Sequence, residues 1–143
     1  MPAKRRSKLP RWWPTCGMLV MRPGRCSLAA CGKRLTGRQT RWCSRRCSQA
    51  FLASHQWARA QLAALKRDAY TCKRCGHTPG KRPNRRGYLI YFRRGHGMEV
   101  NHIAPLNGRG YRLSCAHHLE NLETLCHECH VGVTNHQRQR HTA

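Results

Sequence analysis

Acidic residues are scarce in this sequence. Five of its 143 residues are Asp or Glu, none of them before Asp68, whereas 28 are Lys or Arg. The formal net charge of +23 and the isoelectric point near 11.2 are typical of domains that bind nucleic acid, because such a field attracts polyanions. The basic residues are spread along the whole chain. This spread argues against an ordinary domain that merely carries a basic tail.

Long apolar runs are also missing. No stretch is apolar enough to span a membrane, and the basic N-terminus, MPAKRRSKLPRWWP, is not followed by the hydrophobic segment of a signal peptide. We therefore expect a cytoplasmic protein without a membrane partner. In such a reducing compartment, paired cysteines usually bind metal rather than form disulfides.

The length of the chain limits the size of its domains. A length of 143 residues suits one ordinary domain or two very small ones, and very small domains need metals or disulfides because they bury little apolar surface. Ten cysteines and ten histidines provide metal ligands. Composition predicts a basic arm (1–14), a loop-rich segment with five cysteines (15–50) and a longer module (51–143). The arm either lies along phosphates or is a flexible tail.

A helix is predicted over residues 44–68. Ser44 is a suitable N-cap, and Ala, Leu, Gln and Arg dominate the segment. We expect an interruption near 54–55. The apolar residues that fall on one helical face, and are therefore expected in the core, are Phe51, Ala58, Leu62 and Leu65.

Strand signals follow the helix. Residues 88–92 (YLIYF) and 98–106 (MEVNHIAPL) are rich in aromatic and β-branched side chains, which is typical of strands. Residues 79–87 are expected to form a basic loop. The C-terminal segment from 119 predicts a turn and a last, short helix.

Two CxxC pairs predict a zinc site. Each pair presents two thiolates from one tight turn, and two such turns complete the tetrahedral four-thiolate site that structural Zn²⁺ prefers. The ligands of this site are Cys72, Cys75, Cys126 and Cys129.

Four earlier cysteines suggest a second zinc ion. The segment CGKRLTGRQTRWCSRRCSQAF resembles small treble-clef zinc fingers, in which the last cysteine lies in the first turn of a helix. Cys16 is an alternative ligand for this site. Cys115 has no partner in this pattern, and we expect a small buried or half-buried side chain. The expected ligands are Cys26, Cys31, Cys43 and Cys47.

The segment from about Trp57 to Thr134 resembles the HNH endonucleases, in the branch with a four-cysteine zinc site. The matching stretches are WARAQLAALKRDAYTCKRCG, EVNHIAPL and NLETLCHECH, in that order. They cover over half of the chain and leave the first 50 residues outside. The resemblance implies an α+β fold with a ββα-metal module, in which two antiparallel strands, a loop and a helix surround one catalytic divalent ion. Here a long helix and a small N-terminal zinc finger precede that module.

The resemblance also implies a role for three residues. His102 would be the general base that deprotonates a water, Asn121 would fix the loop and help to orient His102, and His130 would coordinate a catalytic Mg²⁺ or Mn²⁺ that binds the scissile phosphate. The chemistry agrees, because a neutral imidazole is a suitable base at pH 7 and a single metal can neutralise the phosphate and assist the leaving oxygen. The expected products carry 5′-phosphate and 3′-hydroxyl ends.

One position departs from the family pattern. The residue before the base histidine is most often Asp in this family, and here it is Asn101. An amide oxygen is a weaker ligand than a carboxylate for hard ions such as Mg²⁺. Glu99, on the same strand face, either supplies the missing charge, directly or through a water, or pairs with one of the many arginines. The histidines without a family counterpart are expected at the surface or around the site: His117, His118 and His127.

Two functions compete. The first is a metal-dependent DNA endonuclease in a bacterial or phage-infected cell, with RNA as an alternative substrate. The second is a non-catalytic zinc-containing DNA- or RNA-binding module with a weakened HNH site. The joint presence of His102, Asn121 and His130 favours the enzyme.

Candidate phosphate contacts are basic residues of the arm, of the loop 79–87 and of the turn after the strand predicted at 88–92. They are Arg5, Arg6, Arg82, Arg85, Arg86, Arg93 and Arg94.

Overall fold

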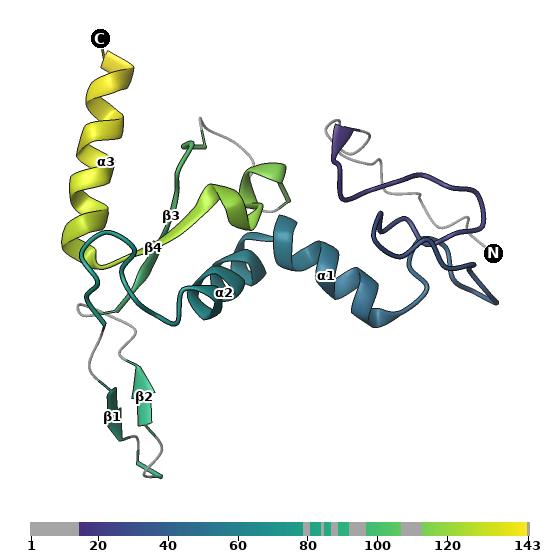
Figure 1. The fold of residues 1–143 in the computed structure, drawn as a ribbon, viewed down its shortest axis with the longest axis horizontal. Coiled ribbons are helices and arrows are strands. Elements are labelled where there is room, and N and C mark those ends of the chain that lie inside the picture. The colour runs from purple at the N-terminus through teal and green to yellow at the C-terminus, as the bar shows by residue number, and fades with distance from the viewer. Residues whose placement is uncertain are drawn as a thin grey trace, which may run out of the picture. The chain divides into compact units, whose positions relative to one another are not determined.

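The chain forms two compact units, Met1–Leu52 and Ala53–Ala143. The structure, a computed structural model, describes residues 15–78, 81–83, 85–86, 89–91, 97–106 and 113–142 (Figure 1). Within these ranges it contains three α-helices and two two-stranded antiparallel sheets. It is therefore a small α+β fold, as the sequence predicts.

The N-terminal unit is built mostly from turns. Its strand-like pairings are single bridges, Leu19 with Leu28 and Arg25 with Arg34. Helix α1 (Arg45–His55) begins where these turns end. Ser44 Oγ accepts a hydrogen bond from the Cys47 amide at 3.3 Å, so the predicted N-cap is confirmed and Cys47 lies in the first turn of the helix.

The predicted helix is interrupted at Gln56. Helix α1 ends at His55 and helix α2 (Trp57–Arg67) begins immediately after Gln56, which is extended with φ −92° and ψ 120°. Gln56 forms an antiparallel bridge with Leu113, and the Ser114 amide donates to the His55 carbonyl at 3.0 Å. The interruption expected near 54–55 is thus confirmed, and it joins the helices to a distant segment.

The break also changes which face of α2 is buried. The buried residues are Ala60 and Ala64, whereas Ala58 is exposed and Leu62 is 45% exposed. The prediction is therefore wrong for Ala58 and Leu62, because an extended residue resets the helical phase, whereas Leu65 does pack against the core. The core of this unit consists of Ala60, Ala64, Val100 and Leu122, with Trp57, Leu65 and Leu119 packed against it.

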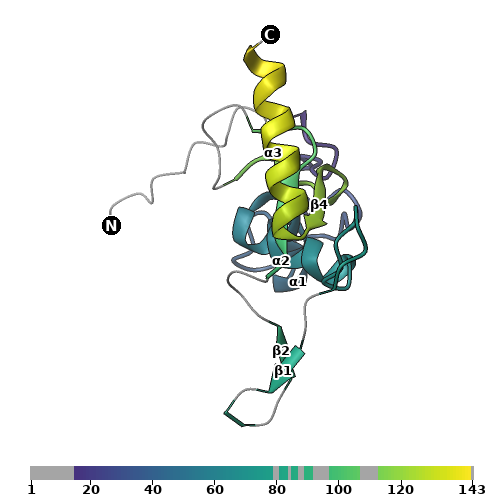
Figure 2. The same cartoon turned by 90° about the vertical axis from the view of Figure 1, so that its left-hand side faces the viewer.

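The second sheet of the chain carries the segments that resemble the HNH pattern. Strand β3 (Glu99–His102) pairs antiparallel with β4 (Leu122–Leu125), with Glu99 opposite Leu125 and His102 opposite Leu122. The sequence predicted β3 but not β4. Helix α3 (His127–Thr142) follows β4 and is longer than the short helix expected. Its first turns lie beside the strands, and its last turns run on toward the C-terminus (Figures 1 and 2).

The other sheet is separate. Strand β2 (Leu89–Tyr91) confirms most of the strand predicted at 88–92, but its partner is β1 (Lys81–Pro83), with Lys81 opposite Tyr91. The loop predicted over 79–87 is therefore wrong at 81–83. The strand at 81–83 forms because its backbone pairs with β2 across a short connection. Its sequence carries no strand-like periodicity that would have predicted it.

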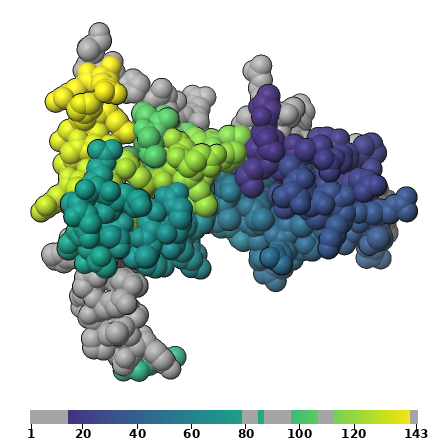
Figure 3. Space-filling model, in the orientation of Figure 1, coloured from purple at the N-terminus to yellow at the C-terminus, as the bar shows by residue number. Residues whose placement is uncertain are grey.

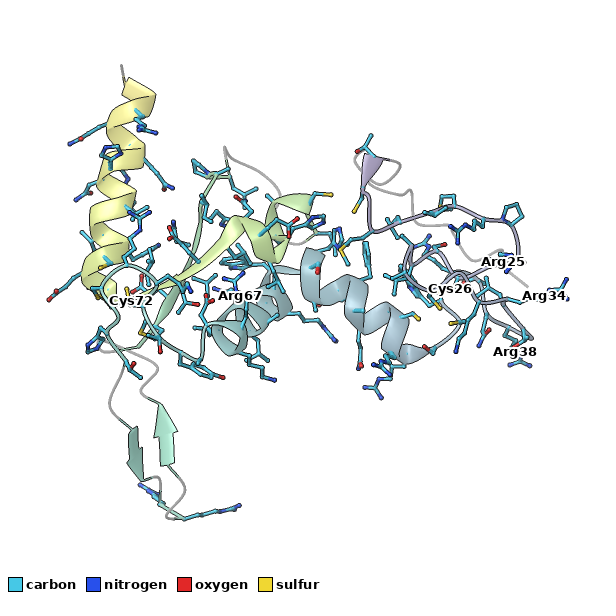
Figure 4. The ribbon with its side chains drawn as sticks, in the orientation of Figure 1. Arg25, Cys26, Arg34, Arg38, Arg67 and Cys72 are labelled. Atoms are coloured by element: carbon cyan, nitrogen blue, oxygen red, sulfur yellow. The ribbon has the colours of Figure 1, made fainter. Side chains whose placement is uncertain are left out.

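An arginine and an aspartate connect the end of α2 to β4. Figure 4 shows the arginine, Arg67, at the end of α2. The Arg67 guanidinium pairs with Asp68 at 2.8 Å and donates to the carbonyls of Leu122, at 2.7 Å, and Leu119. Asp68 in turn accepts the Thr124 amide at 3.2 Å. Burial alone would raise the pKa of the Asp68 carboxyl, but hydrogen bonds from Arg67 and Thr124 outweigh burial and lower it.

Replacing Asp68 by Asn should lower the free energy of unfolding by roughly 2 kcal/mol at pH 7, because a buried charge-assisted network loses its acceptor. The pKa of the folded state lies below that of an unfolded Asp, so this stabilisation is complete above about pH 4 and is lost only as the pH falls through the lowered pKa. Urea unfolding between pH 6 and 8 measures it. Glu128→Gln, at an exposed site, is the control; an equal loss in both variants contradicts the prediction.

Candidate metal centres and catalytic site

The four cysteines of the two CxxC pairs lie around one point. The Sγ atoms of Cys72, Cys75, Cys126 and Cys129 are all within 4.8 Å of one another, and those of Cys75 and Cys126 are 3.6 Å apart. A tetrahedral Zn²⁺ with Zn–S bonds of about 2.3 Å separates its sulfurs by about 3.8 Å. The group therefore fits a structural zinc ion.

The backbone around these thiols ties three elements together. The first pair follows α2, the second begins directly after β4, and Cys129 lies in the first turn of α3. The Lys73 amide donates to the Thr124 carbonyl at 2.8 Å, and the His130 amide donates to the Cys126 carbonyl at 2.9 Å. Figure 3 shows residues 68–78, in teal, adjoining the start of α3, in yellow. An ion here would fix where α3 starts, and with it the position of His130.

The thiols of this group do not ionise alike. Burial opposes ionisation of Cys72, but backbone hydrogen bonds from Cys75, Cys126 and Arg74 outweigh it and lower the pKa to about 6. Hydrogen bonds from Cys126 and Cys75 raise the pKa of Cys129 to about 12. One thiolate therefore forms readily and suppresses the next, so a divalent cation is needed before all four can be thiolates.

The earlier cysteines form a second group of the same kind. The Sγ atom of Cys43 is 3.5 Å from that of Cys31 and 3.6 Å from that of Cys47. A backbone hydrogen bond from Lys33, with help from Cys43, lowers the pKa of Cys31 to about 7, and hydrogen bonding to Cys31 raises that of Cys43 to about 12. The converging set is the expected one, without the alternative Cys16: Cys26, Cys31, Cys43 and Cys47.

His102, the last residue of β3, is almost fully enclosed. The residue is 9% exposed, and its ring stacks on Trp57, with the ring centroids 4.5 Å apart and an interplanar angle of 23°. Its Nε2 atom lies 2.9 Å from Nδ1 of His117. Burial lowers the pKa of His102, and the charge of a protonated His117 would lower it further. His102 is therefore neutral at pH 7.

Asn121 closes the loop that follows His102. It ends a short 3-10 helix, Leu119–Asn121, directly before β4. Its Oδ1 accepts the Ala104 amide at 2.8 Å, and its Nδ2 donates to the carbonyls of Ala116, at 2.8 Å, and Ala104, at 3.3 Å. The Ile103 amide also donates to the Asn121 carbonyl, at 2.9 Å. One side chain thus holds both the exit from β3 and the segment before β4.

A carboxylate and two imidazoles meet between β3 and α3. Glu99 Oε2 contacts Nδ1 of His130, and Glu99 Oε1 lies 2.8 Å from Nδ1 of His127. Among the residues that the structure describes, Glu99 pairs with these two histidines, and the arginine partner that the sequence left open is not found there. A groove of about 510 Å³ adjoins Glu99 and His130, between Met98–Val100 and α2. Carboxylate oxygen with imidazole nitrogen is a donor set that suits Mn²⁺ and, less well, Mg²⁺.

Asn101 has a different neighbour. It is 6% exposed, and its Nδ2 donates to Glu123 Oε1 at 3.1 Å across the β3–β4 pair. Arg74 reaches the same carboxylate at 3.2 Å. Side chains alternate along β3, so Asn101 shares a face with Glu99 while His102 and Val100 occupy the other. Glu99 is the β3 oxygen donor that contacts His130, and the metal-ligand role of Asn101 stays a prediction.

Replacing Asn101 by Asp should lower the free energy of unfolding by roughly 1–3 kcal/mol without divalent ions, because an acceptor then faces the Glu123 carboxylate. Adding Glu123→Gln should remove most of this loss, which a double-mutant cycle measures by urea unfolding. Saturating Mn²⁺ should also remove it if position 101 faces the catalytic ion. An unchanged stability in the single variant would show that the Asn101–Glu123 contact does not form.

His117 lies beside His102, which is one of the two positions, at the surface or around the site, that the sequence left open for it. It is completely buried, in the short 3-10 helix Cys115–His117, so the surface position is excluded. No spacing in the sequence links it to His102, because the contact depends on how two distant segments pack. His127, with its side chain 64% exposed, does lie at the surface.

The candidate phosphate contacts are only partly described. Arg85 and Arg86 are exposed. Arg82 lies in β1; Arg5, Arg6, Arg93 and Arg94 lie outside the described residues. In the N-terminal unit, Arg25, Arg34 and Arg38 are exposed, and Figure 4 shows them beyond Cys26 at the edge of that unit.

Comparisons with protein-family models, curated proteins and solved structures find no match to this chain. A search of the helices in the described residues finds none that is both long and apolar enough to cross a bilayer. The interpretation of the site therefore depends on its residues and their geometry.

Proposed function

We propose that this protein is a metal-dependent endonuclease of the HNH type that hydrolyses phosphodiester bonds in DNA. The observation that carries the proposal is the support given to His102. A neutral, buried imidazole ends β3, and the side chain of Asn121 holds the loop that follows it through three hydrogen bonds. The third residue of the pattern, His130, lies in the first turns of α3, directly after the candidate zinc ligand Cys129.

His117 determines which nitrogen of His102 can act as the base. Its Nδ1 lies 2.9 Å from His102 Nε2, and the tautomer of an imidazole follows from the hydrogen bond made by its other nitrogen. If His102 Nε2–H donates to His117, then His102 Nδ1 carries the lone pair that accepts a proton from water. His117 is thus a positioning residue for the base.

Glu99 and His130 are the residues that would hold the catalytic ion. Their contact brings one carboxylate oxygen and one imidazole nitrogen together beside an open groove. A divalent ion held there would neutralise the scissile phosphate and stabilise the departing 3′-oxygen. The remaining positions would be filled by water and by phosphate oxygen, as is usual for these hard ions.

The basic charge supplies the grip on DNA. Residues 15–52 contain eight Lys and Arg and no acidic residue, and all five acids lie between residues 68 and 128. Phosphate contacts of this kind position a duplex without reading its sequence.

Supercoiled plasmid incubated with the zinc-loaded protein tests the proposal. We expect nicked or linear DNA with Mg²⁺ or Mn²⁺ and intact plasmid with an EDTA concentration that leaves the structural zinc bound. Binding without cleavage under every ion condition would contradict it. The alternative, a non-catalytic DNA- or RNA-binding module, is favoured by one observation: Asn101 stands where a second carboxylate would strengthen the ion site.

The exposed arginines of the N-terminal unit should contribute to DNA affinity. The double variant Arg34→Gln/Arg38→Gln should reduce the slope of log K against log salt by about 2, because each lost phosphate contact removes about one released counterion. Fluorescence anisotropy with a labelled duplex measures this slope. The matched variant Arg59→Gln/Lys66→Gln, at exposed positions of α2, removes the same charge elsewhere. An unchanged slope for the first variant would exclude these two arginines from the contact surface.

A further inference from the structure

Three further metal-ligating side chains converge in the C-terminal unit, where α1 gives way to α2. The Nε2 atoms of His55 and His118 are 2.9 Å apart, and their rings meet edge to face at 4.6 Å. The Cys115 thiol joins them, and the ligand atoms of these three residues all lie within 4.8 Å of one another. None of the three belongs to the four-thiol groups.

The backbone is shaped to bring these residues together. His55 is the last residue of α1, and the extended Gln56 turns away to bridge Leu113. The Ser114 amide donates to the His55 carbonyl at 3.0 Å, and Ser114 Oγ accepts the Ala116 amide at 3.0 Å, which starts the 3-10 helix that carries Cys115. The helix break thus places the buried imidazole of His55 against the segment 115–118.

The donor set is one that zinc prefers. A hydrogen bond between His55 and His118 would account for the two nitrogens, but not for a thiol directed at the same point. Zinc accepts imidazole nitrogen at about 2.0–2.1 Å and thiolate sulfur at about 2.3 Å, so one ion satisfies all three donors. His55 is completely buried, and coordination would compensate a polar side chain in that position.

We propose that His55, Cys115 and His118 bind a zinc ion, in addition to the two ions of the four-thiol groups. The ion connects the end of α1 to the segment 115–118, next to Ser114, whose amide also donates to the His55 carbonyl. His117 lies between two of the ligands, and its ring contacts His102. Zinc at this position therefore also fixes the residue that orients His102. The metal site itself does not depend on whether the protein cleaves DNA.

Zinc content and X-ray absorption of the full-length protein test the site, after dialysis against a weak chelator. The expected result is three zinc ions per chain, with imidazole nitrogen as well as sulfur in the first coordination sphere. Two four-thiol sites alone would give two zinc ions and a sphere of sulfur only, and that result would overturn the proposal. The wild-type measurement needs no variant, so it decides the question even if a variant fails to fold.

Two histidine variants identify the ligands. His118→Ala should reduce the content to two zinc ions and remove the imidazole signal, while His130→Ala should leave both unchanged. If the imidazole signal disappears in His130→Ala and persists in His118→Ala, the nitrogen ligand belongs to the Glu99–His130 pair and the proposal is wrong. His77→Ala, at an exposed position, controls for the loss of any histidine.

Discussion

Replacing His102 by Asn should reduce the rate of DNA cleavage by roughly two to four orders of magnitude, the usual contribution of a general base. Raising the concentration of Mg²⁺ or Mn²⁺ should not restore the rate, because the ion cannot take the proton from water. DNA affinity should stay the same, since the basic residues that contact phosphates lie elsewhere. Rates and affinities are measured on the same labelled duplex.

The choice of Asn separates chemistry from folding. His102 is buried against Trp57, so truncation to Ala would leave a cavity, whereas an amide fills most of the space and can still contact His117. His77→Asn is the matched control at an exposed histidine. If His102→Asn retains wild-type cleavage, His102 is not the base, whatever the ion requirement.

The pH dependence of the wild type gives a further check on the same residue. The pKa of His102 is lowered by burial, and further by the charge of His117 when that residue is protonated. A base must be neutral to act, so the cleavage rate should rise with pH along an acid limb whose midpoint lies below the ordinary value near 6.5. A midpoint clearly above that value would contradict the environment described for His102.

Replacing Cys72 by Ser should unfold the C-terminal unit. Structural zinc contributes on the order of 10 kcal/mol of folding free energy in small metal domains, which is as much as the whole stability of a typical domain. The core of this unit is small, so side-chain packing cannot replace that contribution. Amide hydrogen exchange of peptides covering 99–106 and 119–130 should lose its protection.

The matched variant is Cys43→Ser in the other four-thiol group. It should expose the peptides between residues 25 and 47 and leave protection at 99–106, because each unit has its own set of ligands. Each variant is thus the control for the other. If either substitution leaves exchange unchanged throughout the chain, zinc does not hold the corresponding unit together.

The sequence predicted which cysteines converge because part of that signal is local. Two thiols of a CxxC turn lie close together whatever surrounds them, which applies to both CxxC pairs. The N-terminal set has wider spacings, and its four cysteines converge as well. The N-cap at Ser44 and the interruption near His55 are local signals as well. Strand β3 was found because the segment 98–106 contains the β-branched residues Val100 and Ile103.

The parts that the sequence did not predict depend on long-range packing. Strand β4 is four residues long, lies between a turn and a helix, and is a strand because β3 pairs with it. The buried face of α2 moved to Ala60 and Ala64 because one extended residue reset the helical phase. His117 and His118 were expected at the surface or around the site. The bridge between Gln56 and Leu113 brings their segment against the helix break, where His117 is completely buried.

The central claim is that His102, Asn121 and His130 support metal-dependent hydrolysis of DNA. Cleavage of a short duplex in ¹⁸O-labelled water, with Mn²⁺ and zinc-loaded protein, tests it most directly when the products are weighed by mass spectrometry. We expect one ¹⁸O atom in the new 5′-phosphate, an unlabelled 3′-hydroxyl, and far less of both products with His102→Asn over the same time. An uncut duplex, or a label on a 3′-phosphate, would contradict it.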